Sequence, residues 1–96
     1  MAEERGGVTD NEAASRYELA VEGGTAVLDY AREGGRVYLL HTEVPPELEG
    51  RGHGTRLVRG ALEHVRASGG TAVPRCAFVK AFLKRHPEYA DVVREG

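Results

Sequence analysis

A glycine-rich loop directly before an amphipathic segment points most clearly to chemistry. Three glycines alternate there with an arginine and a histidine, in the order Gly50, Arg51, Gly52, His53 and Gly54. Glycine lets a ligand approach the backbone closely, and free N–H groups at a helix start favour an anion such as a pyrophosphate. We therefore expect anion binding, with Arg51 or Arg56 adding charge-assisted hydrogen bonds. The alternative is a flexible glycine loop that only caps a helix.

The spacing of these glycines excludes two familiar nucleotide-binding loops. A Walker A loop places Gly-Lys and then Ser or Thr after a glycine and four further residues, but Leu57 stands at that distance from Gly52. A dinucleotide fingerprint needs a third glycine where Thr55 stands. It also needs an acidic residue about 20 positions further on, where the chain has Pro74 and Arg75.

Cys76 is a second candidate, because it follows Pro74 and Arg75 and opens a predicted helix. A helix N-terminus and the neighbouring Arg75 would both lower the pKa of its thiol below the ~8.5 of a free cysteine. A thiol of this kind can act as a proton donor or a nucleophile. The alternative is a small buried apolar side chain, which most free cysteines are.

Three strands are predicted to precede the glycine loop. Tyr17, Leu19 and Val21 alternate with other residues in residues 16–22, and the same period of two continues in residues 25–32. Residues 36–44 form a longer, more apolar run, typical of a strand covered on both faces. Gly-Gly pairs at 23–24 and 34–35 join the three strands by short turns. The pattern predicts an antiparallel meander.

The period changes after the loop. Residues 55–67 carry a helical apolar stripe, formed by Leu57, Val58, Ala61, Leu62 and Val65. Residues 71–73 predict a short strand, residues 76–85 a helix with Phe78 and Phe82 in the core, and residues 88–94 a last short helix. The predicted order is β-β-β-α-β-α-α, an α/β fold. The unit of residues 36–44, 55–67 and 71–73 should make its two strands parallel, with a ligand site between Val44 and Thr55.

Length and composition allow one small domain. The chain has 96 residues, a formal net charge of −2 and one cysteine. Near-neutral charge argues against general nucleic-acid binding, and no apolar run approaches the ~20 residues of a membrane span. A single cysteine suits the cytoplasm. We expect a disordered tail over residues 1–15 and the domain over residues 16–96.

Residues 44–57, followed by Ala61 and Leu62, resemble motif A of the GNAT superfamily, the acyl-CoA-dependent N-acetyltransferases. The family pattern Gln/Arg-x-x-Gly-x-Gly/Ala aligns with residues 49–54, and Glu49 departs from it at the first position. The stretch 17–93 resembles the minimal, single-domain members of the superfamily. These share His-Thr-Glu-Val-Pro (residues 41–45 here), Pro-x-Cys (74–76) and Arg-His-Pro-Glu-Tyr (85–89).

The resemblance implies a compact GNAT-like fold and acetyl-CoA as co-substrate. The backbone of residues 51–55 would then hold the CoA pyrophosphate, and Val44 would pair with the pantetheine arm. A slot for that arm would open between Val44 and residues 74–78. The expected binding residues are Val44, Gly50, Arg51, Gly52, His53, Gly54, Thr55, Arg56 and Phe78.

Acyl transfer to an amine needs a neutral amine, a stabilised oxyanion and a proton for the departing thiolate. Glu43 stands at the end of the central strand and shares a face with His41 by alternation, while Thr42 points the opposite way. Either Glu43 or His41 could accept the proton of the amine, although both types are also ordinary at a strand end. Cys76 could protonate the thiolate or take the acyl group itself.

We therefore predict an acetyl-CoA-dependent N-acetyltransferase in which an amine attacks the thioester directly. The alternative is a non-catalytic module that binds CoA or acyl-CoA or contacts a partner. The acceptor stays open among a protein lysine, an N-terminal amine, a polyamine and a small metabolite. No metal site is expected, since the histidines and the cysteine lack ligand spacing, and we expect a monomer or a weak dimer.

Overall fold

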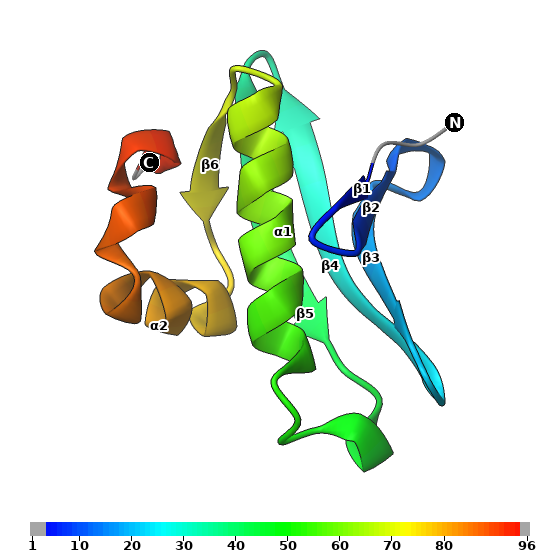
Figure 1. Ribbon diagram of the computed structural model, residues 1–96. Coiled ribbons are helices and arrows are strands. Elements are labelled where there is room, and N and C mark those ends of the chain that lie inside the picture. Colours follow the sequence, from blue (N-terminus) through cyan, green and yellow to red (C-terminus); the bar gives the residue numbers. More distant parts are fainter. Residues whose placement is uncertain (1–3, 95–96) are drawn as a thin grey trace.

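The computed structural model describes residues 4–94 and contains one sheet with strand order β1-β2-β3-β4-β5-β6 (Figure 1). The strands are β1 (Glu4–Arg5), β2 (Val8–Asn11), β3 (Arg16–Val21), β4 (Gly24–Glu33), β5 (Arg36–Glu43) and β6 (Thr71–Pro74). The helices are α1 (His53–Ala67) and α2 (Ala77–Arg85), with 3-10 turns η1 (Glu12–Ala14), η2 (Pro46–Leu48) and η3 (Pro87–Val92). No helix within residues 4–94 is long and apolar enough to cross a membrane.

The predicted α/β order is confirmed, with adjustments at its ends. The predicted strands are β3, β4, β5 and β6, each within one residue of its expected bounds. Strands β1 to β5 form an antiparallel meander, and β6 pairs with β5 in parallel, as the crossover through α1 requires. The last predicted helix is instead the 3-10 turn η3.

The predicted disordered tail over residues 1–15 is wrong for residues 4–15. These residues form β1, β2 and η1, and Val8 is fully buried in the core. The Val8 carbonyl oxygen lies 2.6 Å from Nε2 of His64 on α1. Val8 is the only apolar side chain of β2, too few for a periodic signal, so tertiary packing orders this segment. Residues 1–3 lie outside the described residues.

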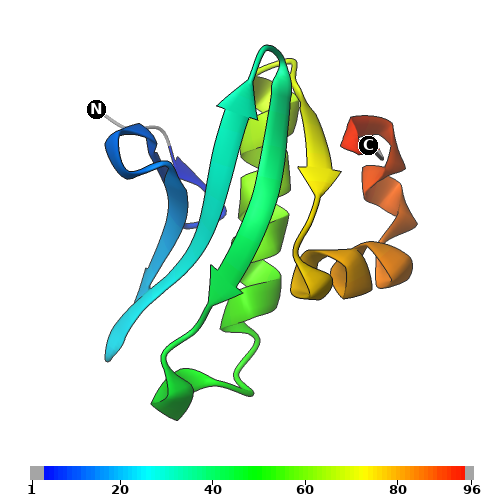
Figure 2. The ribbon, with the colours of Figure 1, turned by 180° about the vertical axis from the view of Figure 1, so that it is seen from behind.

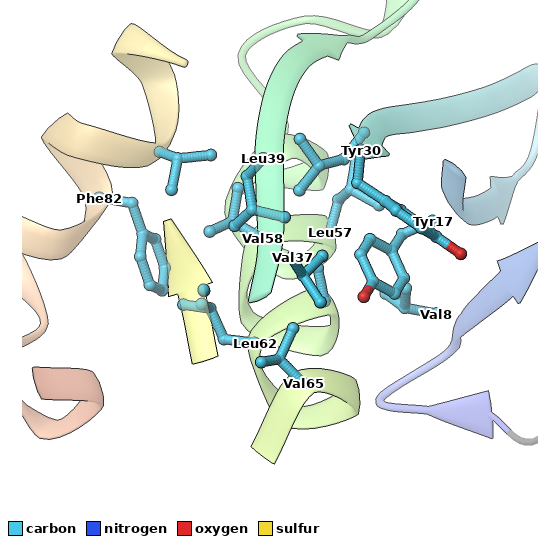
Figure 3. Packing of buried hydrophobic residues seen from close by; sticks show 14 of the residues in the cluster. Val8, Tyr17, Tyr30, Val37, Leu39, Leu57, Val58, Leu62, Val65 and Phe82 are labelled. Carbon is cyan, nitrogen blue, oxygen red and sulfur yellow. The ribbon is translucent and has the colours of Figure 1, made fainter. Parts of the chain in front are cut away.

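One face of the sheet carries the core. Every residue of the predicted α1 stripe is buried, and the stripe packs against β-strand side chains that include Tyr17, Val37 and Leu39 (Figure 3). Phe82 of α2 joins this cluster as predicted. Figure 2 shows that, within residues 4–94, no helix lies over the opposite face of β4 and β5. Leu40 is accordingly 44% exposed, so the expectation that this strand is covered on both faces is wrong.

We expect Gly60→Ala to lower the free energy of unfolding. A Cβ at position 60 would overlap the side chain of Val8 and lie 2.7 Å from the carbonyl oxygen of Arg5. Such overpacking costs about 1–3 kcal/mol, whereas alanine elsewhere in a helix is favourable. Urea denaturation measures the loss. Gly35→Ala is the control, since its Cβ would meet nothing within 4 Å. An unchanged midpoint for Gly60→Ala would contradict the packing of β1 and β2 against α1.

Candidate functional site

The site begins where β5 and β6 part. Their parallel pairing runs from Arg36 opposite Thr71 to Leu39 opposite Pro74. The Arg75 N–H donates a last hydrogen bond to the Leu39 carbonyl, with N···O 2.9 Å. β5 then continues to Glu43, and no strand within residues 4–94 pairs with this edge beyond Leu39. Figure 2 shows the two strands diverging toward the start of α1.

A cavity of about 470 Å³ lies at this opening. Its lining includes every predicted binding residue except Arg51 and Arg56. The lining residues are Thr42, Val44, Leu48, Glu49, Gly50, Gly52, His53, Gly54, Thr55 and Phe78. Thr42, Leu48 and Glu49 were not predicted. The structure therefore brings the end of β5, the glycine loop and the first turn of α2 around one space.

The first turn of α1 presents unsatisfied donors to this cavity. Gly52 is the N-cap at φ +81°, no side chain of the described residues caps the helix, and its first turn holds no acidic residue. The first bond of the helix joins the Arg56 N–H to the Gly52 carbonyl oxygen, with N···O 3.1 Å. The preceding N–H groups thus have no partner within the helix. The helix dipole and these groups together suit an anion.

Two features describe the wall of this cavity. Nδ1 of His53 is buried and has no hydrogen-bond partner within the described residues, so a bound ligand could satisfy it. A Cβ at Gly54 would lie 2.7 Å from Cζ of Phe78, so glycine is required for the ring to pack against the helix start. Phe78 lines the cavity and is 43% exposed, so its predicted place in the core is wrong.

A β-bulge in β5 decides which side chains face the cavity. Tyr30 pairs with Leu39 but Asp29 pairs with His41, so Leu40 is the extra residue. The bulge turns Thr42 toward the helix side of the sheet, where its cross-strand partner on β4 is the buried Leu28. Strict alternation from Val37 and Leu39 would have placed His41 there instead. Periodicity alone could not predict this, because a bulge leaves no sequence signal here.

Thr42 connects the cavity to Cys76. The Thr42 Oγ1 lies 3.3 Å from the Cys76 Sγ, and Cys76 is the N-cap of α2, one residue before the helix. Burial raises the pKa of the Cys76 thiol, but the Thr42 hydroxyl and the backbone N–H groups of Val79 and Phe78 outweigh it. The pKa of this thiol is therefore lowered from its ordinary value, as predicted. Arg75, which was expected to contribute, lies over the ring of Tyr38, 5.6 Å from its centroid.

His41 and Glu43 lie on the other face of the sheet. Their side chains are 64% and 70% exposed, with His41 Nε2 3.7 Å from Glu43 Oε2. They share a face as predicted, opposite Thr42, and neither lines the cavity. The cavity therefore lies on the helix side of the sheet, and the Glu43 carboxylate lies on the uncovered side.

The two predicted arginines do not line the cavity. Arg51 is exposed, and the guanidinium of Arg56 lies beside Gly7 in the turn between β1 and β2. A second cavity of about 150 Å³ shares Thr55 and Phe78 with the first and adds Arg85 and His86. Arg85, the last residue of α2, and His86, its C-cap, were not among the predicted site residues. No three potential metal ligands come together within residues 4–94.

Two comparisons with known proteins agree with this geometry. Residues 16–92 match the family described as GCN5-related N-acetyl-transferase. The fold is similar to the solution NMR structure of a GCN5-like protein from Staphylococcus aureus, with a TM-score of 0.70 and 24% sequence identity. That likeness covers 93% of this chain and 88% of the other.

We expect Thr42→Val to raise the pKa of the Cys76 thiol. The substitution removes a hydrogen bond that favours the thiolate, while the burial that opposes ionisation stays. The pH dependence of alkylation by iodoacetamide follows the thiolate fraction, so its midpoint should move to higher pH. Thr25→Val, on the exposed face of β4, is the matched control. Identical midpoints for Thr42→Val and the parent would contradict the assigned contact.

Proposed function

The chain belongs to the GCN5-related N-acetyltransferase family, and we propose that it transfers the acetyl group of acetyl-CoA to an amine. The observation that carries this proposal is the uncapped start of α1, which faces a cavity at the parting of β5 and β6. This arrangement offers donors for a pyrophosphate beside an open strand edge for an extended arm. Acetyl-CoA has both chemical features.

The first turn of α1 would hold the pyrophosphate. His53, Gly54 and Thr55 line the cavity, their N–H groups belong to the helix start, and that turn holds no acidic side chain. The pantetheine arm would follow the edge of β5 past Thr42 and Val44, where no described strand competes for the backbone. Phe78 would form the opposite wall. The acetyl group would then lie at the opening, between the two faces of the sheet.

Glu43 is the proposed base. The amine nitrogen attacks the thioester carbon, a C–N bond forms, and the tetrahedral oxygen is stabilised by a backbone N–H near Val44. The nitrogen loses its proton to the Glu43 carboxylate, directly or through water. His41, 3.7 Å from that carboxylate, is the alternative base on the same face. The C–S bond then breaks and the thiolate of CoA leaves.

Thr42 and Cys76 would return the proton to the leaving sulfur. Thr42 lines the cavity and Cys76 does not, but the two side chains are hydrogen-bonded. The Thr42 hydroxyl can therefore donate to the thiolate while it accepts the proton of the Cys76 thiol. A lowered pKa makes that thiol a better acid. Because a free thiol of this kind suits a reducing compartment, we place the reaction in the cytoplasm.

We expect acetyl-CoA to bind with micromolar affinity, about −8 kcal/mol, and Gly52→Val to weaken binding at least about tenfold. A branched side chain at φ +81° would distort the helix start that holds the pyrophosphate. Calorimetric titration measures both. Gly69→Val is the matched control, since Gly69 has φ +77° and equally open surroundings at the other end of α1. An equal loss of acetyl-CoA affinity in Gly52→Val and Gly69→Val would mean that the substitutions destabilise the fold in general, and would contradict a pyrophosphate site at Gly52.

We expect Glu43→Gln to lower kcat on the order of 100-fold, the usual contribution of a general base, with unchanged acetyl-CoA affinity. Glu33→Gln, at the far end of β4, is the control. Release of CoA in the presence of an amine measures turnover. If Cys76→Ser kept full transferase activity, the proposed role of Cys76 as proton donor to the leaving thiolate would be wrong. Tight binding with no transfer to any amine would favour the alternative, a CoA-binding module.

A further inference from the structure

The described residues place no lysine or arginine on the wall of the cavity proposed for acetyl-CoA, although its pyrophosphate is an anion. We propose that acetyl-CoA binding takes up a proton at His53, whose imidazolium then holds the pyrophosphate together with the start of α1. The inference rests on the proposed function and makes its co-substrate affinity depend on pH. Three observations support it: the charges around the cavity, the partners of the histidines and the unsatisfied nitrogen of His53.

The charged residue on the cavity wall has the wrong sign for a phosphate. Apart from His53, Glu49 is the one lining residue of an acidic or basic type within the part of the chain that the structure describes. The lining residues from β5, η2 and α2 are all neutral. The thiol of Cys76 also titrates, but it contacts Thr42 and does not line the cavity. The start of α1 therefore has to hold the pyrophosphate against the Glu49 carboxylate, which a protonated His53 would offset.

The cations of the neighbouring elements do not line this cavity. They are Arg51, Arg56, Arg75, Lys80, Lys84 and Arg85. Arg51 is exposed, and the guanidinium of Arg56 lies beside the turn between β1 and β2. Arg75 lies over the ring of Tyr38, and Arg85 lines the smaller cavity next to this one. His53 is thus the side chain on this wall that can become positive near neutral pH.

His53 also differs from the other histidines in its contacts. The chain has four histidines. Two of the others lie beside a carboxylate, and one lies beside a backbone carbonyl. These contacts join His41 to Glu43, His86 to Glu88 and His64 to Val8. By contrast, Nδ1 of His53 is buried and has no hydrogen-bond partner within residues 4–94, which costs free energy until something pairs with it.

The protonation state of the ring decides how this nitrogen can be satisfied. Either neutral form of His53 leaves Nδ1 unpaired, as an N–H without an acceptor or as a lone pair without a donor. The protonated ring carries an N–H on both nitrogens, and a phosphate oxygen accepts a charge-assisted hydrogen bond from it. Without the anion, the same ring holds a charge that nothing balances. Binding of the anion therefore favours protonation, and protonation favours the anion by the same factor.

The test measures the affinity of the full chain for acetyl-CoA by calorimetric titration at three values of pH, about 6, 7 and 8. We expect the affinity of the parent chain to rise roughly three- to tenfold from the highest pH to the lowest, the size of one partly buried charge-assisted hydrogen bond. The 3′-phosphate of acetyl-CoA itself titrates near about pH 6. Variants of this chain are therefore needed to assign the effect to His53.

Two substitutions at position 53 make that assignment. His53→Gln keeps a polar side chain without a titrating proton, so it should match the parent at the highest pH and lose most of the gain at the lowest. His53→Lys keeps its positive charge throughout, so it should bind more tightly than the parent at the highest pH. Because this second variant gains affinity, a loss of structure cannot imitate the result. His86→Gln, on the smaller cavity, is the matched control and should keep the pH dependence of the parent.

The outcomes separate this inference from the function it rests on. If His53→Gln gained as much affinity at low pH as the parent, the role of His53 would be overturned while acetyl-CoA binding stood. Loss of the pH dependence in His86→Gln instead would overturn it as well, and so would a His53→Lys variant no tighter than the parent at the highest pH. A parent chain that bound no acetyl-CoA at any pH would overturn both the proposed function and this inference.

Discussion

The parting of β5 from β6 after Leu39 is the feature on which the rest of the site depends. β6 ends because the chain turns into α2 at Ala77, with Cys76 in extended conformation as the N-cap. β5 continues four residues further and keeps its antiparallel partner on one side only. A strand edge with unpaired backbone groups is normally a liability. Here it lies beside the start of α1, where further donors are unpaired, so one elongated ligand could satisfy both.

The bulge at Leu40 gives this opening its two chemically different sides. By reversing the alternation of β5, it sends Thr42 toward Cys76 and the cavity, and leaves His41 and Glu43 on the uncovered face. The proposed base and the proposed proton donor therefore act from opposite faces of one strand. This separation suits a reaction in which one proton leaves the amine and another reaches the departing sulfur.

The sequence predicted the elements whose signals are local. The apolar residues of α1 recur at the period of a helix, and those of β3 and β4 at the period of a strand. Gly-Gly pairs mark the turns between strands. The bounds of these helices and strands are close to those predicted. The glycine loop was found for a related reason, since its position before a helix suggested unsatisfied donors. Most of the cavity lining follows from that one loop and from the end of β5.

What the sequence did not predict depends on contacts between distant residues. Val8 is ordered by packing against Gly60, 52 positions away in the chain, and nothing in residues 4–15 signals this by period. Phe78 has the spacing of a core residue but packs against Gly54 at the cavity, which is possible because Gly54 has no Cβ to meet the ring. The bulge at Leu40 is likewise fixed by its pairing with β4.

The central claim is that acetyl-CoA binds at the start of α1 and along the free edge of β5. Titration of the ¹⁵N-labelled chain with acetyl-CoA, followed by amide chemical shifts, tests it residue by residue. The account predicts the largest shifts at His53, Gly54 and Thr55, with smaller ones at Val44 and Phe78 and none at Gly69 or Gly70. Unchanged spectra, or largest shifts at the C-terminal end of α1, would contradict it.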